Sequence, residues 1–213
     1  MSESGLPILG ALEARVLAVL AEKAKTTPEQ YPLSLNALVA GCNQKTSREP
    51  VMALADAEVQ AGIETLRGLD LVVETYGAGG RVPRYAHTFA KVYGVPSAAI
   101  DLLTVLILRG PQTVSELRAN CERLHHFADA DAVEGYLDEL AERTPPLAQR
   151  QARGPGAREA RWVHLVCGPV SEADAAPAGL TASGPLAALE KRVAQLETEV
   201  ADLRAKLEIL VGP

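Results

Sequence analysis

The side chains that could do chemistry in this chain are few, and they do not gather into a catalytic set. Cys121 and His125 stand four residues apart, so a helix would bring both to one face as two ligands of a metal ion. Two ligands do not close a metal site, and no second cluster of such residues exists in the sequence. No Ser-His-acid set can be argued from the order of the residues. The sequence therefore predicts no catalytic residue, no metal ligand and no cofactor.

Two further patterns fit ordinary structural roles. The glycine-rich stretch at residues 77–80 follows one expected strand and leads into another, so it offers no helix N-terminus to a nucleotide phosphate. Cys42, Cys121 and Cys167 are odd in number and never form a C-x-x-C pair. This usage favours buried, reduced thiols over disulfides or zinc.

Basic side chains in loops are the remaining candidates, and they could contact nucleic acid or another partner. The candidates are Lys45, Arg48, Arg81, Arg84, Arg150, Arg153, Arg158 and Arg161. Arginine in such loops can bind phosphate with two parallel hydrogen bonds, but it also commonly keeps loop tips soluble. The chain carries a net charge of −6, and residues 1–95, 96–168 and 169–213 are each acidic. This distribution counts against a protein that coats nucleic acid non-specifically.

The elements that must position these side chains come in two copies. Asp56, Val59, Ile63 and Leu66 have nearly the same spacing as Asp129, Val133, Leu137 and Leu140. After each of these helical runs come an apolar stretch, a glycine-rich tip with arginine, and a return through Arg-aromatic-small-His, at residues 84–87 and 161–164. We expect Tyr85 and Trp162 to pack under their hairpins, with the arginines pointing outward.

Apolar periodicity and capping signals set the expected boundaries. In the first copy we expect three helices: one at about 8–24, a second that begins after a Ser34 cap, and a third that runs from an Asp56 cap to about 68–71. Two strands should follow, at 71–73 and 84–86. In the second copy we expect a helix at 98–108, a second helix that begins at a capping box of Thr113 and Glu116, and a third at 129–143. The expected strands are at 147–151 and 161–166.

The predicted fold class is mainly α with small β-hairpins, an α+β protein made of two tandem winged-helix domains and a C-terminal coiled-coil helix. The first domain spans 1–95 and the second 96–168. Residues 169–184 are rich in Ala, Pro, Gly and Ser, which is typical of a flexible linker. Residues 185–213 form the expected coiled-coil helix.

The tail carries apolar residues at alternating steps of three and four, which is the seam of a coiled coil. The seam residues, which we expect to dimerise the chain, are Leu186, Leu189, Val193, Leu196, Val200, Leu203, Leu207 and Leu210. In a parallel pair Arg192 would meet Glu197 of the partner helix, and Glu199 would meet Arg204. A single amphipathic helix folded back on the body is the alternative.

Long strings of residues resemble the YceH-like family of uncharacterised bacterial proteins. They include Tyr31-Pro32-Leu33-Ser34-Leu35-Asn36-Ala37-Leu38, then residues 42–52, 57–60, 108–113, 122–125 and 127–129. The resemblance covers most of residues 8–168 and implies tandem winged-helix domains, without any enzyme activity. His126 departs from the family, in which a proline is expected there.

Function divides between two classes of partner. The expected third helices are acidic, which favours a protein partner, whereas basic hairpins and a two-fold dimer favour double-stranded DNA. We expect a non-enzymatic, cytoplasmic protein that forms a homodimer and is associated with DNA through its basic wings. The alternative is a scaffold that binds protein and not DNA. No apolar run is long enough to span a membrane.

Overall fold

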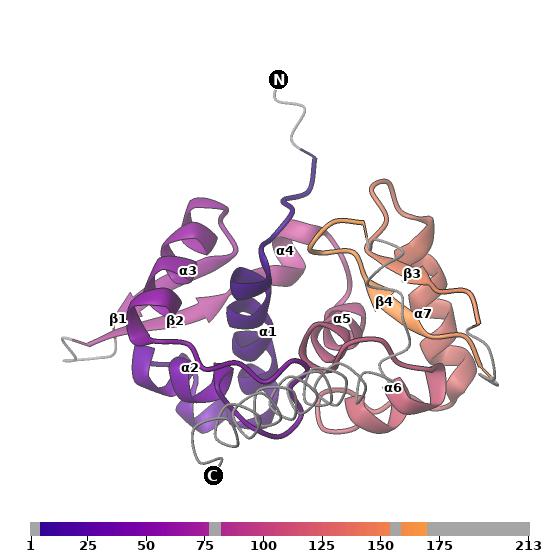
Figure 1. The fold of residues 1–213 in the computed structure, drawn as a ribbon, viewed down its shortest axis with the longest axis horizontal. Coiled ribbons are helices and arrows are strands. Elements are labelled where there is room, and N and C mark those ends of the chain that lie inside the picture. The colour runs from indigo at the N-terminus through magenta and orange to yellow at the C-terminus, as the bar shows by residue number, and fades with distance from the viewer. Residues whose placement is uncertain (1–4, 77–81, 154–158, 170–213) are drawn as a thin grey trace, which may run out of the picture. The chain divides into compact units, whose positions relative to one another are not determined.

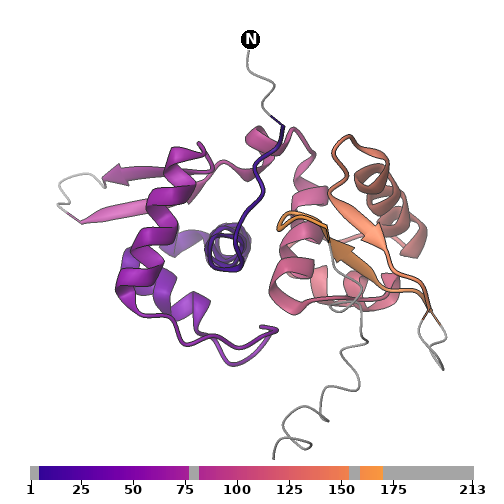
Figure 2. The same cartoon turned by 45° about the horizontal axis from the view of Figure 1, so that its top comes forward.

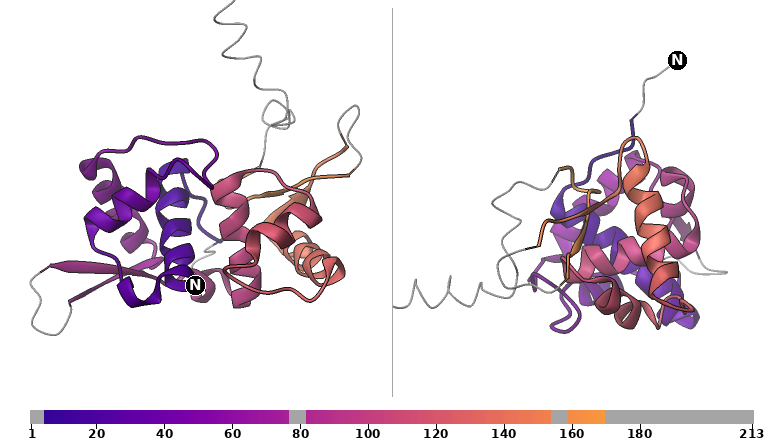
Figure 3. Two further views of the ribbon diagram at one scale, coloured as in Figure 1. Left: turned by 90° about the horizontal axis from the view of Figure 1, so that it is seen from below. Right: turned by 90° about the vertical axis from the view of Figure 1, so that its right-hand side faces the viewer.

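Two buried helices, α1 (Ala11–Thr26) and α5 (Ser97–Arg109), organise the fold. The computed structural model describes residues 5–76, 82–153 and 159–169, and residues 1–170 form one compact unit. Every residue of α1 from Ala14 to Ala21 is buried, as is every residue of α5 from Ala98 to Leu108. A helix that is apolar on all sides must be covered on all sides. The two helices pack against each other, and the other elements cover their remaining faces (Figures 1 and 3).

The first repeat surrounds α1. A 3-10 turn (Pro28–Gln30) leads to α2 (Leu35–Cys42) and α3 (Asp56–Gly68), and both helices pack on α1, as Figure 2 shows nearly along its axis. Gly41 lets α2 approach closely, because a Cβ atom there would lie 2.6 Å from a methyl group of Val19. Strands β1 (Val72–Tyr76) and β2 (Pro83–His87) form an antiparallel pair, and α4 (Phe89–Tyr93) follows.

The second repeat surrounds α5 in the same order. Helices α6 (Val114–Cys121) and α7 (Ala130–Glu142) pack on α5, and β3 (Ala148–Arg150) pairs antiparallel with β4 (Trp162–His164). Each hairpin also gains a short third segment. Leu33 forms a bridge with Tyr85 in the first repeat, and Gln112 forms one with Trp162 in the second. The mixed α+β class and the duplication predicted from the sequence are therefore found.

Capping side chains account for where three of these helices, α2, α6 and α7, begin. Ser34 accepts a hydrogen bond from the backbone of Ala37, and Thr113 and Glu116 form the predicted capping box. Asp129 caps α7 by accepting from Ala132. The prediction that Asp56 caps α3 is wrong, because the cap position is Ala55. That residue has no acceptor in its side chain, so Glu58 accepts from its backbone N–H instead.

Contacts between the repeats go beyond the apolar layer of α1 and α5. The ammonium of Lys25 in α1 lies 3.3 Å from the buried carboxylate of Asp101 in α5. The backbone N–H of Leu9 donates to the carbonyl of Val166 at 2.9 Å, and the Tyr93 hydroxyl donates to the carbonyl of Pro7 at 2.8 Å. The N-terminal segment thus lies against both repeats. The boundary predicted between residues 95 and 96 stays a prediction.

Among residues 5–76, 82–153 and 159–169, none of the helices combines the length and hydrophobicity that a membrane-spanning segment needs. The predicted linker and coiled-coil helix, with all eight seam residues, lie outside the described residues.

Candidate partner-binding surfaces

The arginines that open the two return strands hold equivalent places in the repeats. One guanidinium nitrogen of Arg84 donates to the carbonyl of Pro32 at 2.8 Å, and one of Arg161 donates to the carbonyl of Pro111 at 2.7 Å. Each proline lies two residues before the cap of its second helix, so each arginine ties a hairpin to the start of that helix. Arg161 also pairs with Glu116 at 3.1 Å. Much of the hydrogen-bonding capacity that we assigned to phosphate therefore serves the fold.

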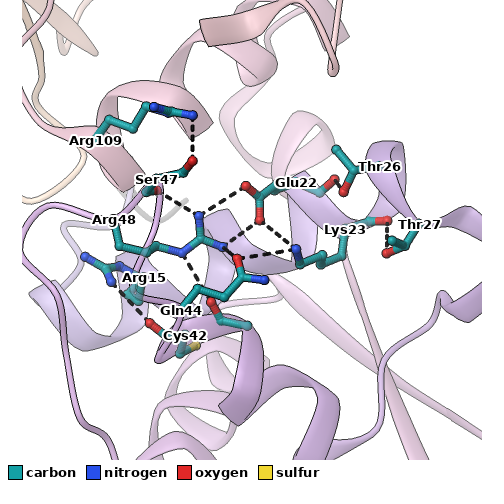
Figure 4. Close-up of polar contacts among 11 residues, drawn as sticks. Arg15, Glu22, Lys23, Thr26, Thr27, Cys42, Gln44, Ser47, Arg48 and Arg109 are labelled. Carbon is teal, nitrogen blue, oxygen red and sulfur yellow. Dashed lines mark hydrogen bonds and ion pairs between the residues drawn. The ribbon is translucent and has the colours of Figure 1, made fainter.

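Arg48 is buried, with 4% of its surface exposed, and its guanidinium is surrounded by acceptors (Figure 4). It forms two hydrogen bonds with the carboxylate of Glu22 in α1, at 2.6 and 3.1 Å. It also donates to the Gln44 side chain at 2.8 Å and to the Gly41 carbonyl at 3.2 Å. Burial alone would raise the pKa of Glu22, but the hydrogen bonds and charge of Arg48 hold that pKa below its usual range.

The polar segment at residues 43–50 is therefore a clamp between the repeats. Beside Arg48, the Ser47 hydroxyl accepts from Arg109 of α5 at 2.7 Å (Figure 4), and the backbone of Glu49 donates to the Leu108 carbonyl at 2.7 Å. Buried Arg15 donates to the carbonyls of Cys42 and Pro50, on either side of the segment. From the sequence, Lys45 and Arg48 of this loop are expected to contact a ligand. In the structure much of its polarity is directed inward.

Three other basic candidates differ in whether their charge is already paired with a carboxylate. Lys45 and Arg153 are exposed and have no ion-pair partner among the described residues. Arg150 is exposed but lies 3.4 Å from the carboxylate of Glu134 in α7. Arg81 and Arg158 lie outside the described residues. Of the candidates that the structure describes, Lys45 and Arg153 are the most available to a phosphate or an acidic partner.

The outer faces of α3 and α7 are acidic, as the sequence predicts. Exposed carboxylates on α3 come from Asp56, Glu58 and Glu64, and on α7 from Asp131, Asp138, Glu139 and Glu142. The basic residue Arg67 on α3 is neutralised by Glu64 and Glu74, each 3.0 Å away. Both surfaces would repel a phosphate backbone and attract a basic partner.

Two of the three cysteines are buried as expected, but the expectation is wrong for Cys167, which is exposed. Cys42 and Cys121 are buried, and burial raises the pKa of each thiol to about 12, so both are protonated at neutral pH. His125 donates its backbone N–H to the carbonyl of Cys121, as expected at a helix end. Among the described residues, no three His, Cys, Asp or Glu side chains are placed to share a metal ion.

His87 and His164, the last residues of the two Arg-aromatic-small-His segments, are neutral in the fold. Burial lowers the pKa of both, and that of His164 falls to about 4. The Nδ1 atom of each is buried without a hydrogen-bond partner among the described residues. Above pH 6.5, the ordinary histidine pKa, His164 is neutral in the folded and unfolded states. Between pH 6.5 and about 4, only the unfolded chain gains the proton, so acid favours unfolding.

We expect the free energy of unfolding to fall by about 3 kcal/mol over that pH range because of His164 alone, since each pKa unit corresponds to about 1.4 kcal/mol. Urea unfolding of the parent and of His164→Gln at several pH values measures this. His126→Gln is the control, because His126 is exposed and pairs with Glu122. If the parent and His164→Gln lose stability in parallel, the buried histidine is not the cause.

Taken together, the fold and its surfaces define a small α+β protein of two similar repeats, with acidic outer helices and mostly intramolecular arginine contacts. The family model for a protein of unknown function, DUF480, matches residues 9–157. The chain belongs to this family, which confirms the resemblance inferred from its motifs.

Relatives match over nearly the whole chain. A UPF0502 protein of Leptothrix cholodnii is 54% identical over 209 residues, which cover 95% of this chain and 93% of the relative. A UPF0502 protein of Burkholderia multivorans is 54% identical over 202 residues, covering 92% and 85%. One of Methylibium petroleiphilum is 51% identical over 204 residues, covering 93% and 87%. The similarity therefore extends beyond the residues matched by the family model.

Proposed function

We propose that this chain is a tandem winged-helix protein that acts by binding a partner protein and catalyses no reaction. The order of elements in each repeat supports the winged-helix assignment. A first helix is followed by a bridging segment, two further helices and a hairpin whose second strand pairs with the bridging segment. In such a fold the third helix and the hairpin are the surfaces that meet a ligand.

One observation carries the choice of a protein partner. The outer faces of the third helices, α3 and α7, present carboxylates where a DNA-binding domain of this type would meet the major groove. Each carboxylate brought against phosphate would cost free energy, and the cost rises as salt is lowered. A basic protein surface would meet the same carboxylates favourably. The internal contacts of Arg48, Arg84 and Arg161 weaken the DNA alternative further.

DNA remains the second candidate because some basic side chains near the hairpins are free. Lys45 and Arg153 are exposed, and Arg81 and Arg158 belong to the glycine-rich tips in the sequence. Lys45 could bind a phosphate from the loop at residues 43–50, and the three arginines could bind phosphates from the expected hairpin tips. The heptad tail supports a homodimer in either case, and a two-fold dimer suits two half-sites on DNA or two copies of a partner.

The first experiment measures DNA binding by the full chain with mixed genomic fragments at two salt concentrations. We expect no retardation at about 0.15 M salt. The informative variant replaces Lys45, Arg81, Arg153 and Arg158 with Ala and leaves Arg84 and Arg161 in place, because the latter two hold the hairpins. If the parent binds DNA at this salt and the variant binds with a smaller salt dependence, DNA and not a protein is the partner, and the proposed function is wrong.

The second experiment looks for the protein partner in cells. A photo-crosslinking residue is placed at Ala57 on α3 or at Gly135 on α7, both exposed, with exposed Lys91 on α4 as the control position. We expect one defined protein to be crosslinked from α3 or α7 and not from α4. Reversing the charge of Asp131 and Asp138 should remove the crosslink from α7. Equal labelling from all three positions would contradict a binding role for these faces.

A further inference from the structure

The first hairpin has one backbone edge that nothing among the described residues covers. Strand β2 lies in the middle, since it pairs with β1 on one side and with Leu33 on the other, where Leu33 and Tyr85 exchange hydrogen bonds of 3.1 and 2.8 Å. Strand β1 has β2 as its only strand partner among those residues. Its opposite side is therefore an open edge.

The register identifies which groups point outward from that edge. The backbone of Thr88 donates to the Leu71 carbonyl at 2.9 Å, and antiparallel strands alternate hydrogen-bonded and non-bonded pairs. Val73 and Thr75 consequently bond to β2. The N–H and C=O groups of the other β1 residues, Val72, Glu74 and Tyr76, point away from it. None of these three has a hydrogen-bond partner for its N–H among the residues that the structure describes. Val72 is only 3% exposed, so the edge is open to a partner at Glu74 and Tyr76.

This edge lacks the features that usually protect one. Proteins guard open edges with lysine, proline or very short strands, whereas β1 is five residues long and exposes Val73 and Tyr76 by 43% and 63%. Val82, across the hairpin from the end of β1, is 61% exposed. The equivalent strand β3 is three residues long and carries Arg150, which pairs with Glu134. The second repeat thus has a guarded edge and the first does not.

Charge at the edge limits what can bind there. The Glu74 carboxylate lies 3.0 Å from Arg67, which also pairs with Glu64, so the group of three carries one net negative charge. A second copy of this chain is a poor occupant. A second copy would bring the same net negative charge to the edge, and a two-fold antiparallel pairing centred on Glu74 would set the two glutamates directly opposite each other, which destabilises strand pairs. A cationic side chain opposite Glu74 would instead complete the group.

We propose that the outer edge of β1 binds an extended segment of a partner protein as an added strand, with a lysine or arginine of that segment opposite Glu74. The main chain supplies the hydrogen bonds at Glu74 and Tyr76, and β-branched side chains of the segment pack beside Val73 and Thr75. This surface adjoins the end of α3 through Arg67 and Glu64, but its hydrogen-bonding groups belong to β1 and not to the outer face of α3 or α7. Binding at β1 therefore goes beyond the proposed function and can be tested separately from it.

The probe is a short, end-capped peptide in which one lysine lies between alternating valines and threonines, with a second peptide carrying glutamate in place of that lysine. Binding of the labelled lysine peptide to the full chain is measured by fluorescence anisotropy. Amide hydrogen exchange locates the bound peptide. We expect the lysine peptide to bind at least about tenfold more tightly than the glutamate peptide and to slow exchange at Glu74 and Tyr76.

Two variants test the edge itself. Glu74→Pro removes one outward N–H and leaves the bonds between β1 and β2, so it should weaken binding by about tenfold or more. Its matched control is Arg150→Pro, which removes the corresponding outward N–H on β3 and should leave binding unchanged. Glu74→Lys needs no change of backbone, and it should reverse the preference between the two peptides.

Three results would overturn the proposal. The first is unchanged affinity in a folded Glu74→Pro variant, and the second is the same peptide preference in Glu74→Lys as in the parent. The third is a slowing of the same amides at high protein concentration without peptide, lost in Glu74→Pro, because the occupant would then be a second copy. A crosslink from α7 in cells bears on the proposed function alone, so the two ideas can fail independently.

Discussion

Trp162→Ala is expected to lower the free energy of unfolding by about 3–5 kcal/mol, the usual cost of removing a large buried aromatic side chain. Trp162 is 2% exposed and heads the set of largest fully buried side chains among the described residues. Its backbone exchanges hydrogen bonds of 2.7 and 3.1 Å with Gln112, so the strand stays in place and a cavity remains under the hairpin. Thermal and urea unfolding of the variant measure the loss.

The control is Trp162→Phe. It keeps most of the volume and removes an indole N–H that is buried without a hydrogen-bond partner among the described residues, so we expect a much smaller loss. Trp162 is also the only tryptophan of the chain, so its emission reports this site directly. An emission maximum typical of full exposure to water in the native parent would contradict the burial on which the expectation rests.

Arg48→Ala should have a comparable effect, about 3–5 kcal/mol, because it leaves a partly buried carboxylate with Lys23, 3.3 Å away, in place of its bidentate partner. Glu22 would keep its place in α1 and lose two hydrogen bonds, and the clamp at residues 43–50 would lose its central donor. Lys45→Ala is the matched control. It lies three residues away in the same loop but is exposed, and we expect a change within about 0.5 kcal/mol.

A double-mutant cycle separates the pair from the rest of the clamp. Replacing Glu22 with Gln in the Arg48→Ala background removes the stranded charge, so the double variant should recover part of the stability lost by Arg48→Ala. Equal stability of Arg48→Ala and Lys45→Ala would show that Arg48 is no more structural than its exposed neighbour. It would also return Arg48 to the set of candidate ligand contacts.

Local features of the fold could be predicted from the sequence where one side chain decides the outcome. Ser34, Thr113 and Asp129 cap their helices because each carries an acceptor at the right position. Asp56 misled the prediction because Glu58, three residues beyond the true cap, supplies the acceptor for Ala55. The short helix α4 was not predicted, since its five residues are too few for a helical period to be recognised.

The candidate site was harder to predict, because sequence shows a charge but not its partner. Arg48 pairs with Glu22, 26 residues away in the sequence, and Arg161 donates to the Pro111 carbonyl, 50 residues away. Neither pairing leaves a local pattern. The acidity of α3 and α7 was predictable, because helical spacing alone places their carboxylates opposite the apolar face. The open edge of β1 depends on strand pairing and could not be identified before the register was known.

The continuous burial of α5 has a consequence for evolution of the chain. Its residues from Ala98 to Leu108 are covered partly by the second repeat and partly by α1 of the first. Neither repeat alone could keep its central helix from water, so a deletion that removed one repeat would leave the other with an exposed apolar face and a tendency to aggregate. Substitutions are then selected on both repeats together. Either repeat can lose a binding surface and still be retained as the structural support of the other.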